Sequence, residues 1–209
     1  MVRNTSGDTT ARYLLSCHHV VFRSTLSQTG AADLTGEVFT IPLGDTKISL
    51  GKPSRPAPYG LHQRSIDAGL VLLDAGGMNV VKRSSYWKAF PTNYADGREQ
   101  MEQFARSRMR LVSQLDSDVK LKYIRHSLGQ EVENYAGAKF RIMEVVISET
   151  LASRHPASGD SGASILSGTI LLSMHIAGDG PLSYSIPAYL LFSEFAFKPK
   201  LALATDEII

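Results

Sequence analysis

Short apolar or alternating runs recur throughout the chain, and most of them end at Gly, Pro, Asp or Ser residues that favour turns. Runs of this length and spacing are typical of an all-β barrel or sandwich, because a helix needs a longer periodic segment. The runs that we expect to form strands are 11–17, 37–42, 47–50, 66–73, 119–124, 139–147, 163–167 and 169–177. No apolar run approaches the ~18 residues of a membrane-spanning helix, so no membrane partner is expected.

Two segments carry helical rather than strand periodicity. In 96–115, apolar residues such as Met101 and Ala105 recur at helical spacing, with charged residues between them. A second helix is predicted near 187–197, where Pro187 suits the first turn. These helices are additions to a pattern that is otherwise rich in strands.

The stretch Gly159-Asp160-Ser161-Gly162 is the strongest candidate for chemistry. Its glycines allow a sharp turn that presents backbone N–H groups beside the serine, which is how an oxyanion hole is built. A serine in that position is a candidate nucleophile for acyl transfer. The alternative is an ordinary turn, which the same four residues also favour.

A nucleophilic serine needs a base, and the base needs a carboxylate that orients it. His18 and His19 stand at the end of an apolar strand, where alternation puts them on opposite faces, so only one of them can be the base. Asp67 enters an apolar run and is the favoured acid. Its competitors are Asp45 and Asp74, and Asp74 follows its run, a common place for a solvated acid.

The candidates His19, Asp67 and Ser161 occur along the chain in the order histidine, aspartate, serine, at spacings of 48 and 94 residues. Among the known Ser-His-Asp triads this order belongs to one group of hydrolases and not to the others. At these motifs the sequence resembles the chymotrypsin-like serine proteases. The segment His18-His19-Val20 is similar to the family's strand end Thr-Ala-Ala-His-Val, which selects His19, and the block at Asp67 is similar to its Asp-Ile-Ala-Leu strand. The resemblance implies that Ser161 is the nucleophile, His19 the base and Asp67 the orienting acid. It also implies an oxyanion hole made by the N–H groups of Gly159 and Ser161.

The same resemblance implies an all-β fold of two six-stranded Greek-key antiparallel barrels, with one helix between the barrels and another near the C-terminus. The expected parts are an N-terminal barrel with the histidine and aspartate over 1–84, a connector with a helix over 85–111, and the serine-bearing barrel with a C-terminal tail over 112–209. Only 18 residues precede His19, enough for one hairpin of 1–3 with 10–16. Either the first barrel is abbreviated or the chain is part of a longer polypeptide. The open edge would then be a place for a neighbouring domain or subunit.

Substrate specificity is predicted from the strand after the nucleophile. His175 lies 14 residues after Ser161, at the spacing of the Gly-Met-His-Val-Gly-Gly-Asn-Gly segment of picornain-like viral proteases, which the sequence resembles here. In those proteases the histidine lines the S1 pocket and binds a P1 Gln or Glu side chain. His175 is therefore expected in S1, with a core histidine as the alternative. Ser173 and His155 are further S1 candidates. The viral pattern has a threonine that assists in S1 at the position of Pro156, and the adjacent His155 could take its place. Intracellular bacterial trypsin-like peptidases are a second similar group.

The composition of the chain indicates which partners, location and cofactors to expect. The formal net charge is +2, so the total gives no strong preference for polyanions. Arg106, Arg108 and Arg110 are expected on a solvated helix face, which makes nucleic acid an unlikely partner. Cys17 is the single cysteine, so an intracellular, reducing, cytoplasmic location is expected, with a virus-encoded origin as one option. The six histidines are scattered, so no metal or other cofactor is expected.

The sequence therefore predicts a serine endopeptidase that processes a specific protein or polyprotein, with cleavage after Gln or Glu as one specificity. Its expected partner is a protein or peptide substrate. The alternatives are a catalytically silent interaction module with a protease fold and an RNA-binding module.

Overall fold

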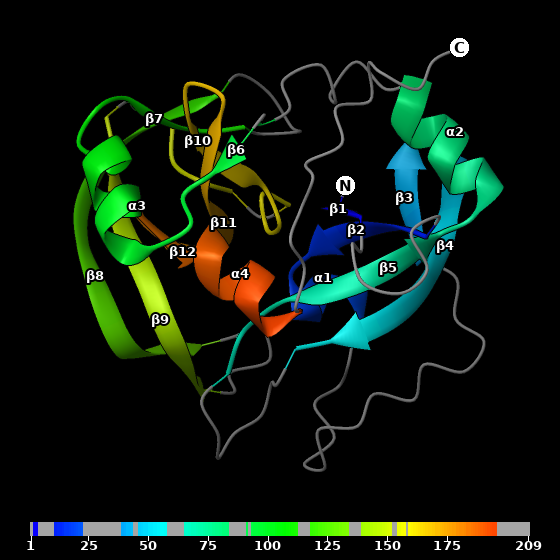
Figure 1. The fold of residues 1–209 in the computed structure, drawn as a ribbon, viewed down its shortest axis with the longest axis horizontal. Helices are drawn as coiled ribbons and strands as arrows, with labels where there is room; N and C mark the ends of the chain where they lie inside the picture. The colour runs from blue at the N-terminus through cyan, green and yellow to red at the C-terminus, as the bar shows by residue number, and fades with distance from the viewer. Residues whose placement is uncertain are drawn as a thin grey trace.

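The computed structural model describes residues 2–3, 11–22, 39–43, 46–57, 65–83, 91, 93–112, 118–133, 139–151, 154–157 and 159–195. Within these residues the chain forms two sheets, of five and seven strands, accompanied by four short helices (Figure 1). The strand-rich fold that the short apolar runs predicted is confirmed. No helix in this described part is long and apolar enough to cross a membrane.

The first sheet has the strand order β1-β2-β5-β4-β3. Its strands are β1 (Val2–Arg3), β2 (Arg12–Ser16), β3 (Phe39–Leu43), β4 (Thr46–Pro56) and β5 (Gly69–Leu73). The pairing of β1 with β2 is that of the predicted N-terminal hairpin. Among the described residues β1 and β3 are the outer strands of this five-stranded sheet, and the sixth strand that the resemblance implied is not among those residues.

Helix α2 (Ala75–Arg83) follows β5 and was not predicted. Gly77 allows α2 to approach β4, because a Cβ at this position would lie 1.9 Å from the carbonyl oxygen of Leu50. The carboxylate of Asp74 accepts the backbone N–H of Gly77 at 2.7 Å and so caps the start of the helix. Asp74 therefore has a structural role, while the other competitor of Asp67, Asp45, lies outside the described residues.

The second sheet has the order β10-β7-β8-β9-β12-β11-β6, and β10 also pairs with β11. This extra pairing closes β7 to β12 into a six-stranded antiparallel barrel, as predicted, and β6 joins β11 in parallel. The strands are β6 (Asn93–Tyr94), β7 (Met109–Leu111), β8 (Val119–Glu133), β9 (Lys139–Thr150), β10 (Ser164–Ser167), β11 (Ile170–Asp179) and β12 (Leu182–Pro187).

The predicted helix over 96–115 is wrong in its second half. Helix α3 (Arg98–Ala105) ends where the hydroxyl of Ser107 donates to the carbonyl oxygen of Phe104 at 2.6 Å. The same hydroxyl lies 2.8 Å from that of Ser167 in β10. A serine that satisfies a backbone carbonyl in this way competes with continuation of the helix.

The chain then enters β7, in the segment that we assigned to the connector. Met109 and Leu111 are buried and Arg110 between them is only half-buried, which is the alternation of a strand. Arg106 and Arg108 fall in the turn before it, and so the three arginines do not form the predicted helix face.

Helix α4 (Ala188–Glu194) confirms the predicted C-terminal helix and begins directly after Pro187. Its Leu191 and Phe192 are buried in an apolar cluster that also contains Ile66 from the first half of the chain and Met174 from β11. Helix α4 therefore packs against both sheets, and it lies between them in Figure 1. The shared core fixes the two halves of the molecule against each other.

A backbone bridge also joins the two halves. The N–H of Ser65 donates to the carbonyl oxygen of Arg141, and the N–H of Met143 donates to the carbonyl oxygen of Ser65, both at 2.9 Å. Ser65 thus pairs with Ile142 of β9, although it belongs to the segment that leads into β5. Because Asp67 is only two residues further on, β9 helps to place it.

Candidate active site

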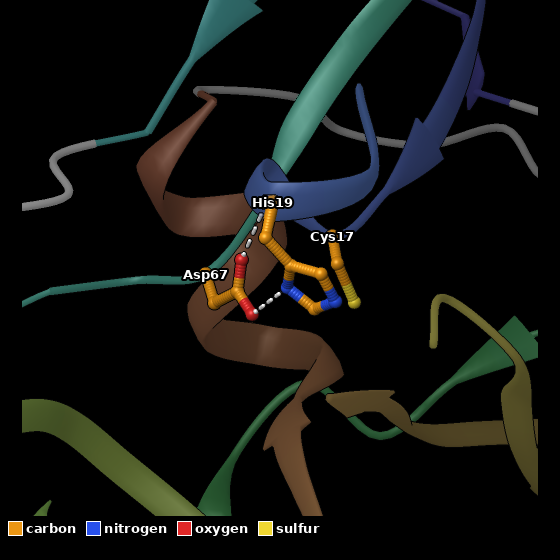
Figure 2. A group of neighbouring side chains, drawn as sticks. All are labelled: Cys17, His19 and Asp67. Carbon is orange, nitrogen blue, oxygen red and sulfur yellow. Dashed lines mark hydrogen bonds and ion pairs between the residues drawn. The ribbon is translucent and has the colours of Figure 1, made fainter. Parts of the chain in front are cut away.

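His19 and Asp67 are in contact, although 48 residues separate them in the sequence. His19 lies in the short helix α1 (His18–Val21), directly after β2, and Asp67 lies just before β5. The ring Nδ1 of His19 is 2.7 Å from Oδ2 of Asp67, and the backbone N–H of His19 donates to Oδ1 at 3.2 Å (Figure 2). These two contacts fix both the ring and its backbone.

The two adjacent histidines lie in a short helix and not in a strand, so they point about 100° apart and not to opposite faces, which corrects the sequence prediction. His18 is buried and its ring lies 4.8 Å from that of Phe22. His19 remains partly exposed, with 22% of its side-chain surface accessible. The structure therefore places His19, and not His18, on Asp67.

The Asp67 carboxylate tunes the basicity of His19. Burial alone would lower the pKa of His19, but the hydrogen bond that its ring donates to Asp67 and the charge of that carboxylate outweigh burial and raise the pKa above its usual value. The Asp67 side chain is almost fully buried, so its charge is poorly screened by water. An imidazole held in this way is a stronger base and forms a stabilised imidazolium.

Cys17 stands beside this pair and contributes a thiol, as Figure 2 shows. One atom each of Cys17, His19 and Asp67 lie within 4.8 Å of one another, a donor set that could hold a metal ion. Each donor is nevertheless engaged: His19 and Asp67 bind each other, and Sγ of Cys17 donates to the carbonyl oxygen of His175 at 3.2 Å. Burial, aided by the Asp67 charge, raises the pKa of the thiol well above its usual value, so the thiol stays protonated.

The loop around Ser161 is a tight turn with positive φ at Gly159 (103°) and Gly162 (90°). The N–H groups of Asp160, Gly162 and Ala163 donate to carbonyl oxygens at 2.9–3.0 Å. Among the described residues, the N–H groups of Gly159 and Ser161 have no such acceptor. These are the two amides that the sequence analysis assigned to an oxyanion hole, and the assignment stays a prediction.

Gly162 brings the Ser161 loop against β2, the strand that precedes the helix with His19. A Cβ at Gly162 would lie 2.3 Å from Oγ of Ser16, the last residue of β2. The carbonyl oxygen of His175 accepts both the N–H of Gly162 and the thiol of Cys17. In this structure the Ser161 hydroxyl donates to the carbonyl oxygen of Ile176 at 3.4 Å, and it forms no hydrogen bond with His19.

Asp160 holds the base of the loop. It is 1% exposed, and its carboxylate accepts the backbone N–H of Ala157 at 2.9 Å, with the guanidinium of Arg154 4.0 Å away. This carboxylate has a structural role. It fixes the backbone immediately before Ser161.

His175, the leading S1 candidate, is buried on β11, and its Nδ1 lies 2.9 Å from the hydroxyl of Ser183 on β12. Burial lowers the pKa of His175 to about 4, with Asp160 raising it and His19 lowering it to smaller extents. The ring is therefore neutral at pH 7. His175 adjoins the other site residues through its backbone, because its carbonyl oxygen accepts the N–H of Gly162 and the thiol of Cys17.

The two further S1 candidates lie in different surroundings. Ser173 is fully buried, and its hydroxyl accepts that of Ser185 at 2.9 Å. His155 is exposed, and its Nδ1 lies 2.8 Å from the hydroxyl of Thr150 at the end of β9. The segment that contains His155 nevertheless approaches β11, since Pro156 lies 3.5 Å from the position of a Cβ on Gly178.

Solved structures of serine proteases have this architecture. Alpha-lytic protease homolog N4 matches with a TM-score of 0.52 and 11% identity, over 94% of this chain and 90% of that chain. A glutamic acid specific serine protease, which utilizes a histidine triad in substrate binding, matches with a TM-score of 0.50 and 15% identity, over 92% and 88%. The fold is chymotrypsin-like. The HRV-C 3C protein with rupintrivir matches at a TM-score of 0.43 and 12% identity, over 85% and 80%, which is too low to support the viral resemblance.

No protein-family model and no curated protein sequence matches this chymotrypsin-like chain. The shared fold therefore rests on structure, and the roles of the site residues rest on their own geometry.

Sequence reasoning within this chymotrypsin-like fold missed Ser183 as the partner of His175. The signal was present, since Ser183 and Ser185 alternate with larger residues in β12 and both are fully buried. Serines that alternate inward on a strand need partners inside the barrel. Which partner each serine finds depends on the register of β12 against β11, and the sequence does not specify that register.

Proposed function

We propose that this chain is a serine endopeptidase. The observation that carries the proposal is the 2.7 Å contact of His19 with Asp67, since Ser16 before it meets Gly162 of a loop whose Gly159 and Ser161 amides have no backbone acceptor among the described residues. A buried carboxylate, an oriented imidazole, a hydroxyl and a pair of free amides are the components of acyl transfer by a triad.

In the proposed mechanism the Ser161 hydroxyl attacks the scissile carbonyl carbon while His19 accepts its proton. His19 then gives the proton to the leaving amine, and water repeats the sequence to release the acyl group. Asp67 keeps the ring in the tautomer with the proton on Nδ1 and stabilises the imidazolium. The amides of Gly159 and Ser161 hold the tetrahedral oxyanion, each contributing about 3 kcal/mol to the barrier reduction.

The Ser161 hydroxyl must leave the carbonyl oxygen of Ile176 to reach His19. Catalytic hydrogen bonds are often long or misaligned without substrate and tighten in the Michaelis complex. The same observation favours the second candidate, a catalytically silent interaction module, if the hydroxyl stays on Ile176.

The proposed specificity is cleavage after Gln or Glu, read by His175. A neutral imidazole that carries one proton suits a P1 side chain with a carbonyl oxygen. The glutamic acid specific protease with the matching fold uses histidines in substrate binding, which supports a histidine in this role here. Cleavage of a P1-varied peptide library after Arg or large apolar residues would contradict it.

An RNA-binding role is less favoured. Arg98 is bonded to Glu102, and Arg110 is bonded to Asp118, so neighbouring acids neutralise two of the arginines around α3. Processing of a specific protein or polyprotein in a reducing, cytoplasmic setting remains part of the proposal.

The test is labelling with a fluorophosphonate, which reacts with activated serines. We expect stoichiometric modification of Ser161, and we expect Ser161→Ala and His19→Ala to abolish both labelling and peptide cleavage. The exposed serine of β4 provides the control Ser54→Ala, which should label like the parent. An unlabelled parent protein would favour the silent module, and near-full cleavage by Ser161→Ala would exclude the assigned nucleophile.

A further inference from the structure

The hydrogen-bond partner of His175 on β12 indicates how its ring would act in substrate binding. The ring is 2% exposed, and its Nδ1 reaches diagonally from β11 to Ser183 on β12. The diagonal arises because the register of the two strands shifts between His175 and Ala177, which sets His175 opposite Ser185 and Ser183 opposite Gly178. Ser183 itself is fully buried.

The contact between Ser183 and His175 has a direction that hydrogen-bond accounting can decide. A neutral imidazole carries one proton, and a serine hydroxyl carries one. If Nδ1 donated to Ser183, the serine proton would need another acceptor. Among the described residues, Ser183 Oγ has no partner other than this ring, so that proton would be buried and unsatisfied, which is costly.

The serine facing Ser183 from β9 does not supply the missing acceptor. Ser148 is directly opposite Ser183 in the pairing of β12 with β9, and its hydroxyl is buried without a hydrogen-bond partner. The other buried serines are engaged elsewhere, since the Ser185 hydroxyl lies 2.9 Å from that of Ser173 and 3.4 Å from the carbonyl oxygen of Val146. Ser183 therefore donates to Nδ1, and the proton of the ring resides on Nε2.

We propose that Ser183 is a specificity-determining positioning residue that holds His175 in the tautomer protonated at Nε2, so that the ring presents a hydrogen-bond donor to the P1 side chain. Among the described residues, no partner engages Nε2 of His175, so this atom is the one available to substrate. The proposal rests on the proposed function, because it assigns His175 to S1. It deepens that function by predicting a preference for an uncharged acceptor, such as the amide oxygen of P1 Gln, over an apolar side chain of similar size.

A change at Ser183 should alter the P1 preference without altering the catalytic residues. Loss of the hydroxyl would leave Nδ1 as an acceptor without a donor and would allow either tautomer. Only the tautomer protonated at Nε2 binds the amide oxygen of Gln, so discrimination falls while the chemistry at Ser161 continues. The β-branched variant Ser183→Thr keeps a hydroxyl and should restore the preference.

The first test reads the tautomer directly. The ¹⁵N chemical shifts of the His175 ring in the intact protein distinguish a protonated Nε2 from a protonated Nδ1 without any need for activity. We expect Nε2–H in the parent protein and a mixture of tautomers in Ser183→Ala. A parent ring protonated at Nδ1, or an unchanged ring in Ser183→Ala, would overturn the proposal even if Ser161 proves to be an active nucleophile.

The second test compares kcat/KM for peptides that differ only in P1 Gln or Met. In Ser183→Ala the ratio should fall about tenfold, while the rate of fluorophosphonate labelling of Ser161 stays unchanged. Ser148→Ala is the matched control, since it removes a buried hydroxyl with no partner from the facing strand and should leave the ratio unchanged. An unchanged ratio in Ser183→Ala, or an equal fall in Ser148→Ala, would refute the role of Ser183, whereas an unlabelled parent protein would refute the proposed function instead.

Discussion

At the scale of single residues, this site depends on groups that are small enough to let two sheets touch. Gly162 meets Ser16 where no Cβ fits, and Cys17 places a thiol on the carbonyl oxygen that also binds the Gly162 amide. Both residues join the half of the site with His19 to the half with Ser161. A change at either position therefore acts on the geometry between the halves.

Gly162→Ala should be far more harmful than an alanine at another glycine with positive φ. The new Cβ would lie 2.3 Å from Ser16 Oγ at a φ of 90°, so strain and a clash combine. We expect a loss of about 1–3 kcal/mol in unfolding free energy and roughly a 100-fold loss in peptide cleavage. Gly168→Ala, with a φ of 58° and open space, is the control and should keep activity. Equal behaviour of the two variants would argue against the contact.

Cys17 should be unreactive in the folded protein. Its side chain has no exposed surface, and burial raises the pKa of the thiol, so little thiolate is accessible. A chromogenic disulfide reagent should leave Cys17 and peptide cleavage unaffected under native conditions and modify one thiol after unfolding in urea. Rapid native modification with loss of cleavage would make the thiol part of the chemistry.

At the scale of elements, β9 connects the second barrel to the acid of the first half. Its residues Arg141 and Met143 bond the backbone of Ser65, and Ile142 packs in the core shared with Ile66. The position of Asp67 is thus set by a strand from the other sheet. This arrangement couples the packing of β9 to the orientation of His19.

Ile142→Ala tests that coupling. Truncating a fully buried isoleucine costs about 2–5 kcal/mol in unfolding free energy, and here the cavity would lie under the Ser65 bridge. We expect kcat to fall while KM changes little, measured on the folded fraction at low temperature. Leu128→Ala on β8 is the control, because Leu128 is 71% exposed and its loss should change stability by less than about 0.5 kcal/mol. An Ile142 variant with lower stability but unchanged kcat would show that β9 supports the fold without positioning Asp67.

At the scale of the whole molecule, buried histidines set the response of stability to pH. Burial lowers the pKa of both His18 and His175 to about 4, whereas an unfolded histidine titrates near 6.5. Between these values the unfolded chain binds protons that the folded chain does not, so stability falls as the pH falls. His19 acts in the opposite sense: its raised pKa gives a stabilising contribution that is present below about 6.5 and is lost as the pH rises through the raised value.

Because the contribution of His19 is already complete below about pH 6.5, the buried histidines with lowered pKa values set the slope there, and urea unfolding should show a net loss of stability from pH 6.5 to 4. Each of these buried histidines can contribute up to about 1.4 kcal/mol per pH unit. His18→Gln should reduce the slope, since it removes one of the three histidines whose pKa is lowered by burial, the others being His126 and His175. A stability that rises on acidification would contradict the buried neutral state of these rings.

The sequence by itself determined the periodic elements and the chemical groups of the site. The apolar pattern of runs such as 169–177 is a property of their own residues and predicts strands. The glycines of 159–162 likewise predict a turn at that motif. The order of His19, Asp67 and Ser161 marked three groups that acyl transfer requires, so the architecture and the candidates were predictable.

Only the tertiary structure decided which of these groups meet. The contact of His19 with Asp67, the capping role of Asp74 and the bond from Ser183 to His175 all depend on strand register and on packing between sheets. The end of α3 at Ala105 has the same cause, because Met109 fits both the helical spacing from Ala105 and the strand alternation with Leu111, and the choice is made when β8 and β10 pair with this segment. Local patterns specify what a segment can form, whereas pairing between residues far apart in the chain selects one outcome, since its free energy comes from partners that no local window contains.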